Sequence, residues 1–304
     1  MLRRTTTPGL ACLLMAVSLL PAQDTRGTIS GRITDPSGAT IAGAAVVVAN
    51  NAMGTKSSIT TGVDGIYRAP LLSPGLYDIV VAAPGFKKAL KSGVEVRVAD
   101  KLDISIVLEI GAAEQQVTVT GDSPLLNTES ASLGTVVDSK RVASLPLSYG
   151  NPFLLIGLTA GVTFNGSVRL DRPFEPTHIV NFSMGGTRGN LNDITIDGAP
   201  TTATANANEV TASYVPPTDI VQEFKVQTGI YSAEFGRGAS QINVTTKSGT
   251  NQYHGALFEF LRNSSLDARQ WLQSTGNKNP FRRNQYGFTL AGPLTIPKVF
   301  NGHD

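Results

Sequence analysis

The segment from Pro216 to Asn251, together with the residues directly after it, constrains the fold more than any other part of the sequence. A short proline-led helix signal is followed by the strand-like EFKVQTG, the glycine-broken loop AEFGRG and the strand-like QINVTTKSG. Beyond Asn251 the pattern changes to YHGALFEFLR, in which aromatic residues recur with a period of two. The sequence therefore predicts a compact unit that leads directly into amphipathic strands.

Composition favours a mainly β protein. Glycine (31 residues) and proline (17 residues) are plentiful, and Val, Thr and Ile recur in short runs, as in strands joined by tight turns. A length of 304 residues is enough for about two domains of ordinary size. The formal net charge of +2 gives no indication of a nucleic-acid partner.

The first 22 residues have the pattern of a secretory signal peptide. Arg3 and Arg4 precede an apolar run from Gly9 to Leu20, and small residues follow, so cleavage is expected near Ala22 and Gln23. The run is too short for a spanning helix, although an uncleaved anchor is the alternative. The only cysteine lies inside this run, so the exported chain is expected to carry neither a disulfide nor a thiol nucleophile.

Residues 26–110 predict a small antiparallel β-sandwich, because short alternating segments are separated by turns such as DPSG and VDG. Two stretches, GTISGRITDPSGATIAGAAVVV and TTGVDGIYRAPLLSPGLYDIVVAAPGF, resemble the carboxypeptidase regulatory-like domain. That resemblance implies a transthyretin-like or carbohydrate-binding-like sandwich. The expected strands are Gly27–Ile33, Ala44–Asn50, Thr55–Thr61, Leu76–Ala82, Val94–Val98 and Leu102–Leu108.

The sandwich is expected to act as a periplasmic spacer or docking unit. No HExxH motif is present, and His178, His254 and His303 all lie outside it, so peptidase chemistry is not indicated. Sugar binding would need exposed flat aromatic side chains, whereas the tyrosines and phenylalanine of this region (Tyr67, Tyr77 and Phe86) are better explained as core or turn-packing residues.

The middle of the chain has two further signatures. One is GNPFLLIGLTAGV, expected to contain a short helix that starts at Asn151–Pro152, after an earlier helix capped by Ser139. The other is NDITIDG, a strand with Ile194 and Ile196 directed inward and an Asp-Gly turn. These segments, with the one described first, resemble the plug of Oar-like TonB-dependent outer-membrane receptors, which implies an α+β plug over residues 114–250.

A short β-prone segment lies where such receptors carry the TonB box, the strand that pairs with TonB. An extended Val/Thr segment with a free edge suits β-augmentation, but it could equally be the first strand of the plug. The segment consists of Glu114, Gln115, Gln116, Val117, Thr118, Val119 and Thr120.

Charged residues of the plug are implied by the resemblance to hold it inside the barrel; they are Arg188, Asp219, Glu223, Glu234 and Arg237. Asp193 and Asp197 are four residues apart on a strand, about 13 Å along it, which is too far for a shared ion without other ligands. We therefore expect turn chemistry there and no metal site.

Residues 252–304 predict the first strands of an outer-membrane β-barrel. In the first, Ala256, Phe258 and Phe260 share one face, and a second candidate covers Gln285–Gly292 with Tyr286 and Phe288 on one face. The arginines at 282 and 283 are expected in the long loop between them. The final AGPLTIPKVFNGHD resembles a recurring segment of Oar-like receptors. Because only two or three strands fit, we expect an N-terminal fragment of a plugged barrel.

The expected function is that of a component of an energy-coupled receptor of the cell outer membrane, in which the plug gates uptake of a bulky ligand. The resemblance implies the C-terminal domain of TonB, outer-membrane lipid and an unknown extracellular ligand, which could be a carbohydrate, as partners. The alternative is a secreted or cell-surface adhesion protein that binds carbohydrate through the sandwich. No catalytic constellation, cofactor motif or metal motif is found, so enzyme activity is not predicted.

Overall fold

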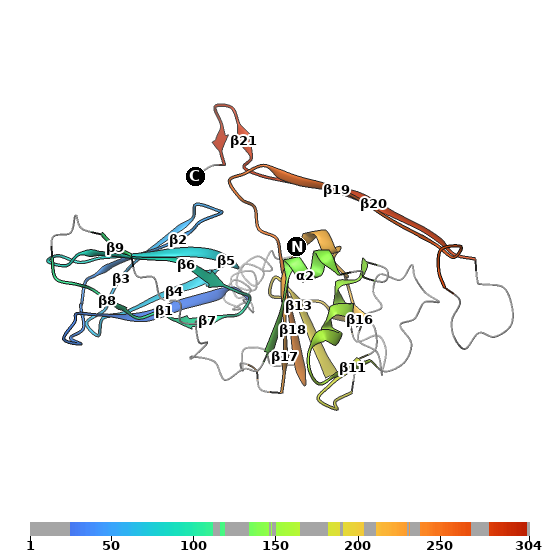
Figure 1. The fold of residues 1–304 in the computed structure, drawn as a ribbon, viewed down its shortest axis with the longest axis horizontal. Coiled ribbons are helices and arrows are strands. Elements are labelled where there is room, and N and C mark those ends of the chain that lie inside the picture. Colours follow the sequence, from blue (N-terminus) through green and yellow to red (C-terminus); the bar gives the residue numbers. More distant parts are fainter. Residues whose placement is uncertain are drawn as a thin grey trace, which may run out of the picture.

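The computed structural model describes residues 25–111, 116–118, 134–145, 147, 150–164, 182–188, 191–203, 211–229, 231, 238–268 and 280–302. Strands dominate these residues, and helix is confined to short stretches in the middle of the chain, which confirms the mainly β fold class. The predicted signal peptide, with its cleavage position near Ala22 and Gln23, lies outside the described residues. Figure 1 shows the sandwich on the left, the plug sheet in the middle and a long hairpin that runs above the plug toward the right.

The sandwich consists of two sheets. One has the order β3-β2-β5-β6-β9, and the other has the order β4-β1-β7, with β8 also paired to β1. The strands are β1 (Gly27–Thr34), β2 (Ala45–Asn50), β3 (Lys56–Thr60), β4 (Ile66–Leu72), β5 (Gly75–Ala82), β6 (Lys88–Val96), β7 (Lys101–Asp103), β8 (Ile106–Val107) and β9 (Gln116–Thr118).

Its core is formed by the alternating inward side chains of both sheets. Ile29 of β1, Val46 of β2 and Ile79 of β5 are fully buried, as the period-two pattern predicts. Tyr67 and Tyr77 are buried in the same core, and Phe86 packs against it, which confirms their interpretation as packing residues. The Tyr67 hydroxyl donates a hydrogen bond to the Ile104 carbonyl at 2.7 Å, so its polar end is satisfied.

The sandwich differs from the prediction in three ways. Strand β4 was not predicted, because Pro70 lies inside it and a proline argues against a ladder strand. Strand β6 starts at Lys88 and not at Val94, and its first half combines the exposed Lys88 with the buried Ala89. The sandwich is also mixed and not purely antiparallel, since β7 and β8, predicted as one strand, pair with β1 in parallel.

The plug contains a five-stranded sheet of order β10-β17-β18-β13-β14. Figure 1 shows α2 on the side of this sheet that faces away from the sandwich. Apolar residues of the sheet and of the helical segments, including Phe224, Val226, Val142 and Phe153, form a second core there. The elements are β10 (Gly134–Asp138), α2 (Ser139–Ser144), η2 (Pro152–Leu158), β11 (Val162–Phe164), β12 (Phe182–Met184), β13 (Asn192–Ile196), β14 (Ala199–Pro200), β15 (Thr202–Ala203), β16 (Thr211–Ala212), η4 (Thr218–Ile220), β17 (Val221–Thr228) and β18 (Ser240–Thr246).

The two predicted helices are present with corrected details. Helix α2 is capped by Asp138, whose carboxylate accepts a hydrogen bond from the Arg141 amide, so Ser139 is its first residue and not its cap. The second helix is a 3-10 helix, capped by Asn151 with Pro152 first. Its buried side includes Phe153 and Leu155.

The Asp-Gly turn after β13 is confirmed. Asp197 and Gly198 have φ values of 48° and 82°, the left-handed conformations that such a turn requires. The Asp197 carboxylate accepts hydrogen bonds from the Thr246 amide at 2.9 Å and from the Thr246 hydroxyl at 2.7 Å. Ile194 is buried and Ile196 packs against the plug core, as predicted.

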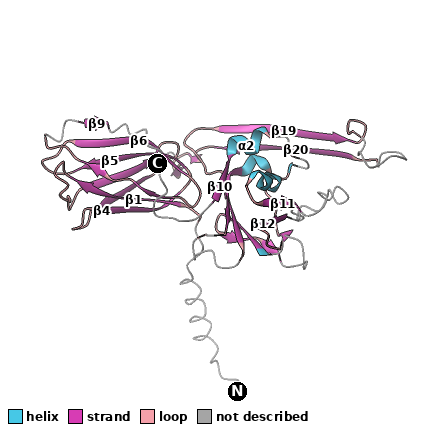
Figure 2. Cartoon of the chain, turned by 60° about the horizontal axis from the view of Figure 1, so that its bottom comes forward, coloured by secondary structure: helices cyan, strands magenta, loops and turns pink. Residues whose placement is uncertain are grey.

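A long hairpin leaves the plug directly after β18. Its strands are β19 (His254–Asn263) and β20 (Arg282–Ala291), and a small hairpin of β21 (Thr295–Ile296) and β22 (Phe300–Asn301) follows. Figure 2 shows β19 and β20 running side by side, past α2. Arg282 and Arg283 therefore begin β20 and do not lie in the loop as predicted. Within the described residues, no helix is long and apolar enough to cross a bilayer.

Candidate functional site

The sandwich and the plug meet at a joint between the turn at residues 97–100 and strand β17. The Val98 amide donates a hydrogen bond to the Glu223 carboxylate. The Lys225 ammonium forms an ion pair with Asp100 at 3.0 Å and donates to the Ala99 carbonyl at 3.3 Å. Glu223 and Lys225 share the face of β17 opposite the plug core, because side chains two apart on a strand point the same way.

The joint is buried although it is largely polar. Only 5% of the Lys225 side chain and 13% of the Asp100 side chain are exposed. Val98 is fully buried, yet it belongs to neither apolar core, so its burial comes from this contact region. Charged groups that leave water need close partners, and here the partners come from sequence positions more than a hundred residues away.

Burial sets the electrostatics of Glu223. The pKa of this carboxyl is raised to about 7, chiefly because burial removes the carboxylate from water, and the negative charges of Asp100 and Glu95 act in the same direction. The hydrogen bond from Val98 and the positive charge of Arg97 act in the opposite direction. Glu223 therefore changes charge close to neutral pH.

A second contact joins the sandwich to the start of the hairpin. The Asn251 amide donates to the Ala52 carbonyl at 3.2 Å, and the Asn251 side chain donates to the Met53 carbonyl at 3.0 Å. Asn251 lies between β18 and β19, so the turn between β2 and β3 contacts the chain where the plug ends. The sandwich thus touches the plug sheet and the exit from the plug.

The plug sheet carries a polar network on the face opposite its apolar core. The Thr195 hydroxyl donates to the Asn243 side chain at 2.8 Å, and Asn243 donates to the Gln227 side chain at 3.0 Å. All three residues are buried and come from three neighbouring strands. This network extends the polar face on which Glu223 and Lys225 lie.

The segment predicted to contact TonB forms part of the sandwich. Strand β9, which contains Gln116, Val117 and Thr118, pairs with β6 in parallel and is absent from the plug sheet as described. The interpretation of this segment as the first plug strand is therefore wrong. The TonB-contact interpretation stays a prediction, and Glu114, Gln115, Val119 and Thr120 lie outside the described residues.

The predicted plug–barrel charges are not brought together. Arg188 is exposed after β12, Asp219 is half-buried in η4, and Glu223 contacts the sandwich. Glu234 and Arg237 lie outside the described residues. A role for these residues toward a barrel wall stays a prediction.

The two faces of the hairpin differ in chemistry. The outer face carries five apolar residues that are between 61% and 88% exposed: Leu257, Leu261, Tyr286, Phe288 and Leu290. Glu259, the cross-strand partner of Tyr286, is exposed on the same face. The cross-strand register pairs Leu257 with Phe288, so these residues lie together.

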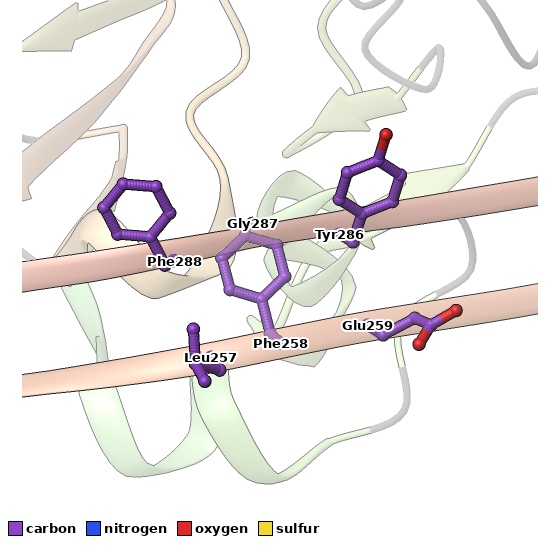
Figure 3. A pocket seen from close by; sticks show the side chains of 6 residues that line it. All are labelled: Leu257, Phe258, Glu259, Tyr286, Gly287 and Phe288. Carbon is purple, nitrogen blue, oxygen red and sulfur yellow. The ribbon is translucent and has the colours of Figure 1, made fainter.

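The opposite face of the hairpin lies toward the plug. It carries Phe258, Gln285 and Gly287. The Gln285 side chain lies beside Gly150 of the plug, where a Cβ added to the glycine would be 3.4 Å from the Gln285 Oε1 atom. Figure 3 shows the ring of Phe258 over Gly287, where a side chain on the glycine would collide at 2.5 Å. The six residues labelled in Figure 3 come from both faces of the hairpin and line a shallow groove on it.

Sequence reasoning missed Lys225, Asp100 and Asn251. A charged residue in a strand is ordinarily read as solvent-facing. The burial of Lys225 could have been predicted from its apolar neighbours in EFKVQTG, because such a pattern is typical of a strand covered on both faces. Among the described residues, no group of three His, Cys, Asp or Glu side chains could hold a metal ion.

Comparisons with known families agree with this arrangement. Residues 28–109 match the carboxypeptidase regulatory-like domain, which covers most of the sandwich. Residues 245–302 match an outer membrane beta barrel domain, which covers the long hairpin and the small one after it.

A curated relative extends the comparison to nearly the whole chain. The TonB-dependent transporter Oar of Myxococcus xanthus is 26% identical over 287 residues, which make up 90% of this chain. The chain is thus similar in sequence to a TonB-dependent transporter over most of its length. The chain spans 26% of the length of that relative.

Solved structures match parts of the chain. The siderophore receptor PirA of Acinetobacter baumannii is 21% identical, with 55% of this chain and 23% of that chain covered and a TM-score of 0.39. The ferric enterobactin receptor PfeA of Pseudomonas aeruginosa is 20% identical, with 53% and 22% covered and a TM-score of 0.37. At these scores neither likeness bears on the fold or the function of this chain.

Proposed function

We propose that the intact protein is an energy-coupled receptor of the outer membrane, to which this chain contributes the sandwich, the plug and the first strands of the wall. The observation that carries the proposal is the hairpin that follows β18: its outer face carries five exposed apolar side chains beside one carboxylate, that of Glu259, and its other face lies toward the plug. Strands of outer-membrane barrels alternate between lipid and lumen in this way. The similarity to a TonB-dependent transporter supports the same function.

In this proposal the plug blocks the lumen, and its movement admits a bulky extracellular ligand. The polar network and the buried joint suit a plug that rearranges in water, because polar contacts exposed by movement can be hydrated. No covalent chemistry is needed. The outer face would contact membrane lipid, and the segment from Glu114 to Thr120 would contact the C-terminal domain of TonB.

A synthetic peptide of residues 112–125 tests the coupling step. Calorimetric titration with the purified C-terminal domain of TonB is expected to give saturable binding, because an extended segment can add to a sheet edge. A peptide of the same composition in scrambled order is the control. Equal or absent binding of the two peptides would contradict the assignment of this segment.

A further inference from the structure

Strand β9 occupies the end of a sheet. In the order β3-β2-β5-β6-β9 it is the terminal strand, so only one of its two edges is paired with β6 among the described residues. The paired residues are Lys88 with Gln116, Ala89 with Val117, and Leu90 with Thr118. A terminal strand presents a row of N–H and C=O groups to which another extended strand can pair.

The sandwich gives β9 a fixed position relative to the plug. Strand β6 pairs with β9 near its first residues, and its last residue, Val96, leads directly into the turn that carries Val98 and Asp100. Those two residues belong to the joint with Glu223 and Lys225. One strand therefore connects the position of β9 to a buried contact with the plug.

We propose that the sandwich is a platform that presents the coupling segment as a preformed edge strand to one incoming strand of a partner, which is TonB. This inference rests on the proposed function and adds a role for the sandwich. Pairing with β6 fixes the backbone of residues 116–118 before the partner arrives, so the partner does not bear that ordering entropy.

A substitution at Lys88 tests the platform without altering the coupling segment. Lys88 pairs with Gln116, whereas the register of β6 with β5 begins at Ala89. Lys88→Pro removes the backbone donor of this residue at the start of a strand, where proline is otherwise tolerated. Lys88→Ala is the matched control, because it removes the same side chain and keeps the donor.

Two measurements on the full chain are needed. Amide hydrogen exchange of residues 116–118 is expected to be slower in the wild type and in Lys88→Ala than in Lys88→Pro, while exchange in β2 stays unchanged as a sign that the sandwich is folded. Affinity for the TonB C-terminal domain is expected to fall at least about tenfold in Lys88→Pro only, since ordering three residues is costly.

The outcomes separate the inference from the function on which it rests. Equal affinity of all three proteins for the TonB domain, or tighter binding by Lys88→Pro, would overturn the platform. Binding of the peptide of residues 112–125 would still support the receptor function in that case. Exchange of residues 116–118 in the wild type as fast as in the isolated peptide would also overturn it. If TonB binds neither the peptide nor the chain, the proposed coupling function itself fails.

Discussion

Replacement of Glu223 by glutamine is expected to change how stability depends on pH. Burial raises the pKa of this carboxyl from its ordinary value of 4.5 to about 7 in the folded chain. Below pH 4.5 the group is protonated in both the folded and the unfolded chain and contributes no difference. As the pH rises from 4.5 to 7, the unfolded chain loses the proton first, so stability is progressively lost.

The magnitude follows from the shift of about 2.5 pH units. At about 1.4 kcal/mol per unit, ionisation of Glu223 lowers the free energy of unfolding by about 3 kcal/mol above pH 7 relative to pH 4. Glu223→Gln keeps an oxygen that can accept from the Val98 amide but carries no titrating proton. The free energy of unfolding of the variant, minus that of the wild type, is therefore expected to increase by about 3 kcal/mol between pH 4 and pH 8.

The assay is urea unfolding of both proteins at half-unit steps from pH 4 to pH 8, followed through the transition that involves the plug. The difference between the proteins cancels the other titrating groups. Repetition in about 1 M salt screens the charges of Glu95, Arg97 and Asp100 more than it changes the effect of burial. A difference that stays flat between pH 4.5 and 7 would refute the reasoning, and so would one that falls.

Three further substitutions test the packing. Lys225→Met should lower the free energy of unfolding by about 1–3 kcal/mol because Asp100 loses a buried charged partner, and calorimetry should find no such loss in the exposed control Lys56→Met. Gly31→Ala should cost about 3 kcal/mol or prevent folding of the sandwich, because the new Cβ would lie 2.0 Å from the carbonyl oxygen of residue 104; unchanged thermal unfolding would contradict this. Asp138→Ala should cost about 1 kcal/mol through loss of the α2 cap, whereas Asp138→Asn should retain most of it in the same urea titration.

Local chemistry made much of the fold predictable from the sequence. The Asp197–Gly198 turn, the start of the second helix at Pro152 and the alternation of β19 and β20 each depend on residues close in the chain. The same rules failed where two local signals conflicted. Pro70 concealed β4, which pairs with β1 despite it, and Asp138 took the cap that the sequence assigned to its neighbour Ser139.

The joint could not be predicted, because its partners are set by tertiary contact. Glu223 was interpreted as a residue facing a barrel wall, and nothing near it in sequence indicates Val98. Lys225 lies between apolar neighbours, a pattern that predicts burial but not the carboxylate that pairs with it. The position of β9 could not be predicted for a similar reason. A short edge strand can join either the sandwich or the plug sheet, and only the tertiary contact with β6 places it in the sandwich.

The central claim is that the hairpin begins a wall with lipid on one side and the plug on the other. Phe288→Cys and Gln285→Cys place a fluorescent label on the two faces, and the chain's single native cysteine lies in the predicted signal peptide. In outer membranes that contain the protein, lipids with a quencher on the acyl chain are expected to quench the label at 288 and to leave the label at 285 bright. Equal quenching at both positions, or a bright label at 288, would contradict the account.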